Sequence, residues 1–381
     1  IDSRTGLNPR KNFVLGSGDN AYITIKDIYD GKINISDKTD RVDDAAIQTI
    51  KKRSRIAPGD ILFVSIGRIG ETAIVQEKDD SWDVNESVFI FTINDDIIIP
   101  EYFCLLFESE DVRNSLTKNS SGSTFKSIKM GQLERMEFDI PSLNEQKNIV
   151  DQINKIKSIR IARIKELEQF DLLIKARFVE MFGDENNSLN WDMVNVEDVA
   201  DVQVGVVIKP SQYYTGKKDG IPAFRSLNIG EGFIKNMDWV YFSQEGNDKN
   251  SKSILKENDL LIVRSGAPGT ACVVTKEFEG YNAIDIIIAH PDCSKVNPYY
   301  LCTYTNMPHG KKQIQEGTGG AAQQHFNVGK YNKLKLMLPP VELQNEFVGF
   351  IKQVDKSKFA VQKSLDEAQL LFDSLMQEYF G

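Results

Sequence analysis

The chain has 381 residues, of which 41% are hydrophobic and 27% are charged, and these proportions exclude a disordered or fibrous protein. The formal net charge of -9 argues against a protein that coats nucleic acid regardless of sequence, because neutralising phosphates needs clustered Lys and Arg. The chain contains no apolar run of roughly eighteen residues and no leader at its start, so we expect a soluble, cytoplasmic protein.

The cysteines show no pattern typical of a metal site or a disulfide framework. None of the four lies in a CxxC pair, and only three histidines are available to complete a ligand set. We expect reduced, partly buried thiols, with a structural zinc site as the alternative, and we predict neither a metal nor a cofactor. The cysteines are Cys104, Cys272, Cys293 and Cys302.

An internal repeat is the strongest feature of the sequence. APGDILFVSIGRIGETAIV (57–75) recurs as KENDLLIVRSGAPGTACVV (256–274), a shift of 256 minus 57, or 199. NAYITIKDI (20–28) matches the apolar and polar pattern of IPAFRSLNI (221–229). PSLNEQ (141–146) recurs as PPVELQ (339–344), and Phe182-Gly183 recurs as Phe380-Gly381, both shifted by 198. Four anchors in the same order predict two copies of one unit.

Short β-rich runs at 60–66 and 259–263, bounded by Gly and Asn turns, predict strands in each copy. Pro100 and Pro298 favour the first turn of a helix. Each copy should form an α/β (α+β) domain of roughly 140 to 150 residues. Trp191–Ala200 has no counterpart before Ile1, so we expect the first copy to be clipped at its start, by trimming or by rearrangement.

Past Pro141 and Pro339 the pattern changes to a helical period of alternating three- and four-residue steps. This period predicts two helices of roughly 38 residues, about 57 Å long, that pair as an antiparallel coiled coil. The alternative is that each helix folds back on its own domain. The predicted helix-pair interface consists of Ile149, Ile153, Ile156, Leu167, Phe170, Ile174, Phe347, Ile351, Val354, Val361, Leu365, Phe372 and Leu375. The apolar positions of the first helix are interrupted by Arg160, Arg163 and Arg177, and those of the second helix by Lys358.

The predicted organisation is therefore a pseudo-twofold repeat of domain and helix. Residues 1–142 form the first domain, 143–183 the first helix, 184–339 the second domain and 340–381 the second helix. Pairing of the helices would hold the two domains a fixed distance apart.

Five basic residues and only one acidic residue lie in the corresponding part of each copy. The alternative interpretation is a basic surface that contacts only solvent. The clusters are Arg113, Lys118, Lys126, Lys129 and Arg135, and Lys311, Lys312, Lys330, Lys333 and Lys335.

Over nearly its whole length the chain resembles the specificity subunit of type I restriction-modification enzymes. The resemblance rests on the duplicated plan, on GDILFVSIGRIGETAIV and NDLLIVRSGAPGTACVV, on Asn85 and Asn282, on the loops SSGSTFKSI and GTGGAAQQHFNV, and on PSLNEQ and PPVELQ. It implies two target-recognition domains that each bind half of a split site in double-stranded DNA. It also implies two docked methyltransferase subunits that methylate adenine with S-adenosylmethionine, and restriction subunits that join them.

Sequence recognition requires side chains that reach base edges, so polar and basic residues near the Gly-rich loops are the candidates. The predicted DNA-binding residues are Thr24, Lys26, Arg68, Ser123, Thr124 and Lys126 in the first copy, and Arg225, Asn228, Arg264, Gln323, Gln324 and His325 in the second. Each could instead be an exposed side chain without a contact. Arg68 aligns with Ala267, and Arg264 aligns with Ser65, as expected if the two copies recognise different half-sites.

Catalytic motifs are missing from these segments. Asn297-Pro298-Tyr299-Tyr300 has one proline where an amino-methyltransferase motif has two, and Asp60 and Asp259 lack the acid and lysine of a nuclease site, so a turn role is favoured. Asn85 and Asn282 are interpreted as turn-stabilising amides. We predict a non-catalytic subunit, with a coiled-coil scaffold without DNA binding, or a self-contained enzyme, as the competing hypotheses.

Overall fold

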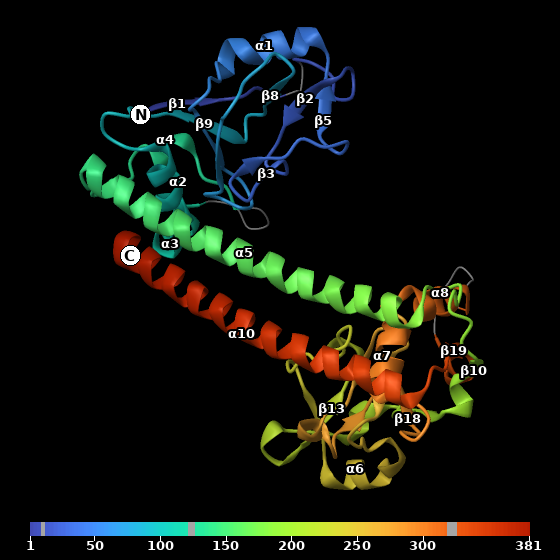
Figure 1. Ribbon diagram of the computed structural model, residues 1–381. Helices are drawn as coiled ribbons and strands as arrows, with labels where there is room; N and C mark the ends of the chain where they lie inside the picture. The colour runs from blue at the N-terminus through green and yellow to red at the C-terminus, as the bar shows by residue number, and fades with distance from the viewer. Residues whose placement is uncertain (9–11, 121–125, 318–325) are drawn as a thin grey trace. The chain divides into compact units, whose positions relative to one another are not determined.

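The apolar runs Ile61–Val64 and Leu260–Val263 form the central strands of two sheets with the same strand order. The computed structural model describes residues 1–8, 12–120, 126–317 and 326–381 (Figure 1). It divides into unit 1, Ile1–Lys165 with Gln362–Gly381, and unit 2, Glu166–Val361.

Unit 1 has an antiparallel sheet of order β1-β9-β6-β7 and a smaller sheet of order β5-β2-β8, in which β2 and β8 are parallel. Between the two sheets lies a cluster that includes Ile23, Leu62 and Val84. The elements are β1 (Asp2–Thr5), β2 (Asn20–Ile23), β3 (Ile28–Tyr29), β4 (Lys32–Ile33), β5 (Asp40–Val42), α1 (Asp44–Ser54), β6 (Ile61–Val64), β7 (Thr72–Ile74), β8 (Trp82–Val84), β9 (Val88–Thr92), α2 (Pro100–Glu108), α3 (Glu110–Asn119), α4 (Met130–Leu133) and the start of α5 (Leu143–Phe182).

Unit 2 repeats this plan with sheets of order β11-β18-β15-β16 and β12-β14-β13-β17, and it adds the pair β10-β19. The strands are β10 (Met193–Asn195), β11 (Ala200–Val204), β12 (Tyr214–Thr215), β13 (Ile221–Phe224), β14 (Val240–Phe242), β15 (Leu260–Val263), β16 (Ala271–Val273), β17 (Asn282–Ala283), β18 (Ile286–Pro291) and β19 (Lys335–Met337). The helices are the end of α5, then α6 (Gln244–Lys249), α7 (Pro298–Asn306), α8 (Pro308–Gly317), α9 (Val328–Asn332) and the start of α10 (Val341–Phe380), whose end belongs to unit 1. Short 3-10 turns are η1 (Val196–Asp198), η2 (Pro210–Tyr213), η3 (Lys217–Asp219), η4 (Ser226–Asn228), η5 (Ser251–Ser253) and η6 (Lys276–Phe278).

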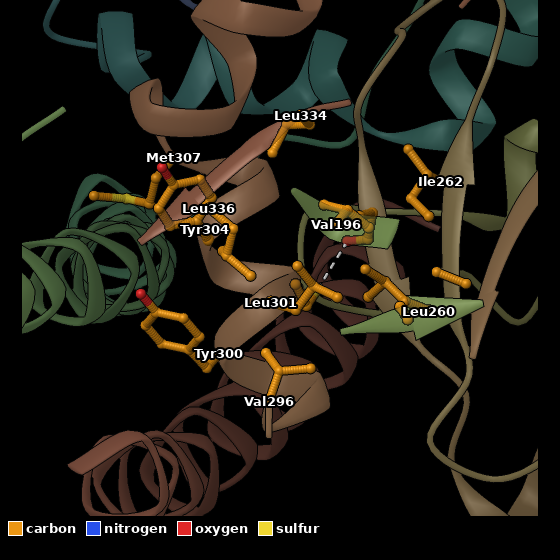
Figure 2. Packing of buried hydrophobic residues seen from close by; sticks show 14 of the residues in the cluster. Val196, Leu260, Ile262, Val296, Tyr300, Leu301, Tyr304, Met307, Leu334 and Leu336 are labelled. Carbon is orange, nitrogen blue, oxygen red and sulfur yellow. Dashed lines mark hydrogen bonds between the residues drawn. The ribbon is translucent and has the colours of Figure 1, made fainter. Parts of the chain in front are cut away.

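The core of unit 2 lies between its main sheet and the helices. Tyr300 and Leu301 of α7 pack with Leu260 and Ile262 of β15, and Val196 completes the layer (Figure 2). In unit 1 the equivalent cluster joins Phe63 of β6, Phe103 of α2 and Ile153 of α5. The duplicated mixed fold predicted from the sequence is confirmed.

The two long helices begin where the sequence predicted, two residues beyond Pro141 and Pro339, and each has 40 residues. In unit 1, Gln152 and Arg160 of α5 contact Tyr379 and Phe372 of α10, respectively. In unit 2, Asp171 and Arg177 of α5 pair with Lys358 and Glu346. Because residue numbers rise along one helix as they fall along the other, the segments in each unit run antiparallel.

Candidate functional site

The turn that follows the central strand lies at one edge of the main sheet in both units. In unit 1 the carbonyl of Ser65 accepts a hydrogen bond from the amide of Ile128, at 3.0 Å. In unit 2 the carbonyl of Arg264 accepts the equivalent bond from Phe326, also at 3.0 Å. We call these segments, 65–71 and 264–270, the sheet-edge turns. Their alignment across the repeat is confirmed by these two bonds.

The second glycine of each sheet-edge turn has a backbone conformation that favours glycine. Gly70 and Gly269 have φ of +93° and +86°, and a Cβ on either would lie within 3.0 Å of Leu116 or Ile314. A positive φ disfavours other residues, so the glycine repeats with the turn.

Arg264, a predicted DNA contact, is held by partners within unit 2. Its Nε donates to the carbonyl of Phe326 at 3.2 Å, and its Nη1 pairs with Asp285. Only 16% of its side chain is exposed. The guanidinium therefore fixes the start of the segment after residue 325, and it can reach a base only if it leaves these partners.

Arg68, in the other sheet-edge turn, is more open. Its Nη2 donates to the carbonyls of Ile25 and Ile28, its Nε pairs with Glu71 at 2.9 Å, and 51% of its side chain is exposed. It therefore stabilises the turn before β3 while still presenting a charge to solvent.

Thr24 and Lys26 lie in the turn that Arg68 contacts. The Thr24 hydroxyl donates to Asp27 at 2.9 Å, whereas Lys26 is exposed. The hydroxyl of Thr24 is thus used within the turn, and Lys26 is the side chain that stays available.

Asn228, a predicted DNA contact, has its side-chain amide bound within unit 2. Its side chain is fully buried, and it donates to the carbonyl of Met237 at 2.6 Å while it accepts from the amide of Arg225 at 2.9 Å. Because both ends of the amide are hydrogen-bonded inside the unit, no atom remains for a base edge. Arg225 is half-buried and donates to the carbonyl of Asp238, so it also acts mainly within the fold.

The remaining predicted contacts flank the Gly-rich loops. Lys126 is exposed, and its carbonyl accepts from the amide of Gly67 at 3.0 Å, which places it beside the sheet-edge turn of unit 1. The other candidates, Ser123, Thr124, Gln323, Gln324 and His325, lie outside the described residues.

The second basic cluster is partly neutralised. Lys311 pairs with Glu231, and Lys333 pairs with Glu197. Within the described part of the chain, at least these two cations of the cluster have an acidic neighbour, which weakens the case for this cluster as the main phosphate contact.

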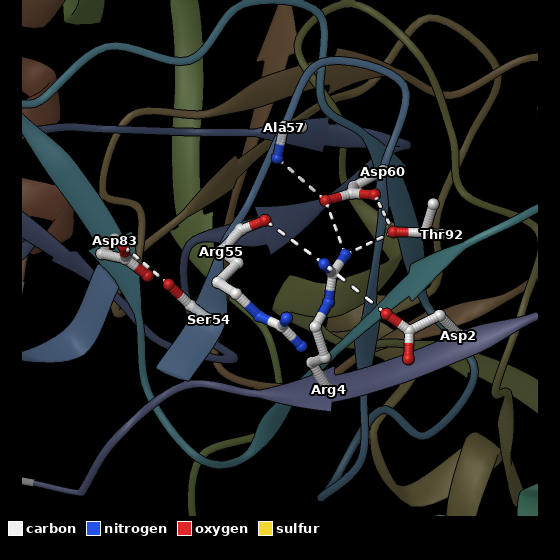
Figure 3. Close-up of polar contacts among 8 residues, drawn as sticks. All are labelled: Asp2, Arg4, Ser54, Arg55, Ala57, Asp60, Asp83 and Thr92. Carbon is white, nitrogen blue, oxygen red and sulfur yellow. Dashed lines mark hydrogen bonds and ion pairs between the residues drawn. The ribbon is translucent and has the colours of Figure 1, made fainter. Parts of the chain in front are cut away.

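The aspartates Asp60 and Asp259 close equivalent turns, as the sequence predicted. Asp60 accepts from the amide of Ala57 at 2.9 Å and also contacts Arg4 and Thr92 (Figure 3). Asp259 accepts from the amide of Lys256 at 2.7 Å, and its other oxygen lies 2.6 Å from His290 Nδ1. Both carboxylates have structural partners, so nothing assigns them to a metal.

The repeat pairs Asn282 with Asp83 rather than with Asn85. Asp83 accepts from Ser54, and Asn282 accepts from Ser253 at 2.6 Å, in each case linking a strand to the helical segment before it. Asn85 accepts from the amide of Ser87 at 3.0 Å, so its predicted turn role is confirmed. Asn282 instead lies in β17, fully buried.

The side chains of the predicted helix-pair interface are buried to different degrees. Ile149, Ile153, Ile156, Phe347, Ile351, Val354 and Val361 are buried, and Leu167, Phe170, Ile174, Leu365, Phe372 and Leu375 are half-buried. Ile149 and Ile153 pack against the domain of unit 1 as well as against Met376 and Phe380 of α10. Helix pairing and contact with the neighbouring domain therefore occur together.

Arg160 and Arg177, two of the three arginines that interrupt the apolar positions of α5, stack on aromatic rings. The guanidinium of Arg160 lies 5.0 Å from the ring centre of Phe372, and that of Arg177 lies 5.8 Å from Phe350. Cation–π contact lets a charged residue occupy a position that is otherwise apolar.

Two repeated features escaped the sequence prediction. Gln146 and Gln344 are fully buried and each bridges the start of a long helix to the segment before α2 or α7. Phe178 and Phe182 are also fully buried, in an aromatic cluster with Tyr300 and Phe347. The repeated Gln and the repeated Phe-Gly pair were visible in the sequence, but their spacing alone assigns no contact.

We expect His309 to make the stability of unit 2 depend on pH. It is buried, its Nε2 contacts the carbonyl of Gly183 at 3.1 Å, and Nδ1 has no hydrogen-bond partner among the described residues. Burial lowers the pKa of His309 below its ordinary value of 6.5. The unfolded chain therefore takes up the proton first, so the stability contributed by the neutral ring is present above about pH 6.5 and declines as the pH falls below it.

We expect His309→Gln to flatten the stability profile of unit 2 between about pH 6.5 and 5. Denaturant unfolding at a series of pH values, followed for wild type and variant, measures this. The difference between the two profiles removes the contribution of the other histidines. Parallel profiles would contradict the assignment.

Within the described residues, no three His, Cys, Asp or Glu side chains gather as a metal-binding group. Among the same residues, no helix combines the length and apolarity needed to span a membrane.

Comparison with known proteins places these features in context. Residues 1–169 and 188–368 match the type I restriction modification DNA specificity domain. The specificity subunit of the type I restriction enzyme MjaIX from Methanocaldococcus jannaschii is 22% identical over 387 residues, covering 94% of this chain and 85% of that protein. The StySPI specificity subunit from Salmonella potsdam is 20% identical over 294 residues; the match covers 74% of this chain but 64% of the relative's length.

Two solved structures share the fold. A chain from a study of complex assembly and conformational transition of the type I R-M system has a TM-score of 0.62 at 19% identity, covering 99% of this chain and 94% of that chain. The S subunit from M. genitalium has a TM-score of 0.52 at 14% identity, covering 100% and 93%.

Proposed function

Because the chain belongs to the type I restriction-modification DNA specificity domain family, we propose that each unit recognises one half of a two-part DNA sequence. In this proposal the chain carries no catalytic centre. Methyltransferase subunits bound to it methylate adenine with S-adenosylmethionine, and restriction subunits join the complex.

One observation carries the proposal: two units of the same topology present different side chains at equivalent edges. In the sheet-edge turns, the exposed Arg68 of unit 1 stands where unit 2 has the exposed Ala267, whereas Ser65 and Arg264, which also differ, are held inside the fold. Base pairs are distinguished by hydrogen-bond donors and acceptors at their edges, so different side chains on one framework favour different half-sites.

The long helices support the docking of two equal partners. Three exposed apolar side chains on α5 recur on α10 with a shift of 198: Ile161 with Phe359, Leu172 with Leu370, and Leu173 with Leu371. Their exposed fractions run from 46% to 75%. Apolar residues on the outer face of a helix pair are typical of protein contacts, and the repetition favours the same partner twice.

We expect Phe359→Glu combined with Leu370→Glu to reduce the complex from two methyltransferase subunits per chain to one, because the charges oppose burial of the α10 surface. Native mass spectrometry of the assembled complex measures the stoichiometry. Lys356→Glu, a charge change at an exposed position of the same helix, should leave two subunits bound. Two subunits on the double variant would contradict this surface.

The function itself is tested by mapping methylated adenines in DNA from cells that carry this chain and a partner methyltransferase. The proposal expects one gapped sequence to be methylated throughout the genome. Exchanging unit 2 residues 205–325 for those of a relative should change one half of that sequence and leave the other half unaltered. Methylation without sequence preference would overturn the proposal.

A further inference from the structure

A loop that the sequence prediction passed over lies beside the sheet-edge turn of unit 2. It runs from Val206 to Lys218, between β11 and β13, and we call it the lysine loop. Its base is joined to Ile284 and Asp285: Val206 donates to the carbonyl of Ala283 at 2.8 Å, and the amide of Asp285 donates to Val206 at 3.1 Å.

Asp285 connects the lysine loop to the predicted DNA-binding turn, because its carboxylate pairs with Arg264. Arg264 in turn holds Phe326, where the described chain resumes. Ile208 is two residues from Val206, within about 7 Å along the chain. The lysine loop, the sheet-edge turn and the residues at Phe326 therefore meet at one edge of unit 2.

The composition of the lysine loop is unusual for this chain. Lys209, Lys217 and Lys218 are exposed, and Asp219 is the one acid between β11 and β13, in a protein whose net charge is -9. Val207 and Ile208 are 48% and 79% exposed, and Lys209 has a φ of +43°. Large aliphatic groups left in water forgo the free energy of burial, so their position beside cations indicates a contact surface.

The start of the lysine loop is held rigidly, and the same start recurs in unit 1. A Cβ on Gly205 would lie 2.3 Å from the carbonyl oxygen of Ala283, and one on Gly6 would lie 1.8 Å from that of Val84, so only glycine fits at either position. At the other end, Tyr213 packs against the ring of Phe242, and its carbonyl accepts from the amide of Ser243 at 2.8 Å. Val207, Ile208 and Lys209 lie between these two fixed points, and Lys217 and Lys218 follow the second one.

We propose that the lysine loop is a DNA-contacting loop of unit 2, in which Ile208 packs against a thymine methyl group in the major groove and Lys209, Lys217 and Lys218 contact phosphates. This inference rests on the proposed function. Thymine is the base that presents a methyl group in that groove, so an aliphatic side chain favours it over cytosine. The lysines fix the loop on the backbone without selecting a base.

The methyl contact is tested with the complete complex and a DNA duplex that contains the sequence that the complex methylates. Each thymine of the target is replaced in turn by deoxyuridine, which lacks only the methyl group. At the thymine that Ile208 contacts, the wild-type complex should bind the deoxyuridine duplex about fourfold more weakly, which is the effect of removing one buried methylene. Ile208→Ser should show the same loss on the normal duplex and no further loss with deoxyuridine. Leu189→Ser, a change at another exposed aliphatic residue of unit 2, should bind as wild type.

The phosphate contacts are tested by the dependence of affinity on salt. Each Lys→Ala change at 209, 217 or 218 should lower the slope of log affinity against log salt concentration by about 0.9. Lys249→Ala, in α6, should leave the slope unchanged. Wild-type affinity in Ile208→Ser, or an unchanged slope in the triple lysine variant, would overturn the inference while the proposed function stands. A wild-type complex without sequence preference would overturn both.

Discussion

Phe347→Ala is expected to lower the free energy of unfolding of unit 2 by about 3–5 kcal/mol, the largest effect of any single change considered for this protein. Phe347 is fully buried, and its ring centre lies 5.4 Å from those of both Phe178 and Phe182. Truncation leaves a cavity where the start of α10, the end of α5 and α7 meet. Thermal unfolding, with hydrogen exchange to locate the loss, measures the change.

The matched control is Phe359→Ala on the same helix. Its side chain is 75% exposed, so the change should alter stability by less than about 0.5 kcal/mol. Hydrogen exchange should speed up in α7 and in the end of α5 for Phe347→Ala alone. Equal stability of the two variants would show that the aromatic cluster does not hold the helices to unit 2.

Gln344→Leu should cost unit 2 about 3 kcal/mol, because it removes the side-chain partner of three buried or part-buried backbone groups. The Gln344 side chain accepts from the amide of Asn297 at 2.8 Å and donates to the carbonyls of Lys295 and Pro339 at 3.2 and 2.8 Å. The start of α10 should loosen from the segment before α7. Denaturant unfolding and exchange of the backbone amides at 297 and 299–301 measure the effect.

Gln146→Leu tests the same bridge in unit 1, where the side chain accepts from Ile99 and donates to Ile97 and Pro141. The loss should be similar but confined to unit 1. Gln353→Leu, at an exposed position of α10, is the control and should leave the stability of unit 2 nearly unchanged. If Gln344→Leu behaves like Gln353→Leu, water or local rearrangement satisfies the three groups.

Much of the architecture could be predicted because it depends on local pattern. The strands around Ile61–Val64 and Leu260–Val263 follow from apolar runs bounded by turns, and the long helices follow from their period. Pro100 and Pro298 do stand at the first turn of α2 and α7. The repeat strengthened each prediction, because the same pattern predicted the corresponding element in both copies.

The candidate DNA contacts were harder to predict because a polar residue in a loop can serve the fold or a ligand. Asn228 has the composition of a base-contacting side chain, yet three neighbouring backbone groups occupy its amide. Arg264 is similar, since Asp285 is 21 residues away in sequence and no local pattern indicates the pair. The lysine loop was overlooked because exposed aliphatic residues look like core residues until burial is known.

The amino-acid sequence by itself determined the duplicated plan, the strand and helix types and the family resemblance, because periodicity, turn residues and repeat spacing act over short stretches of chain. Only the tertiary structure decided which of the candidate DNA-contacting side chains are exposed and which are hydrogen-bonded inside the fold. Hydrogen-bond partners come from distant segments, and an amide or guanidinium that is satisfied inside the fold is no longer available at its surface.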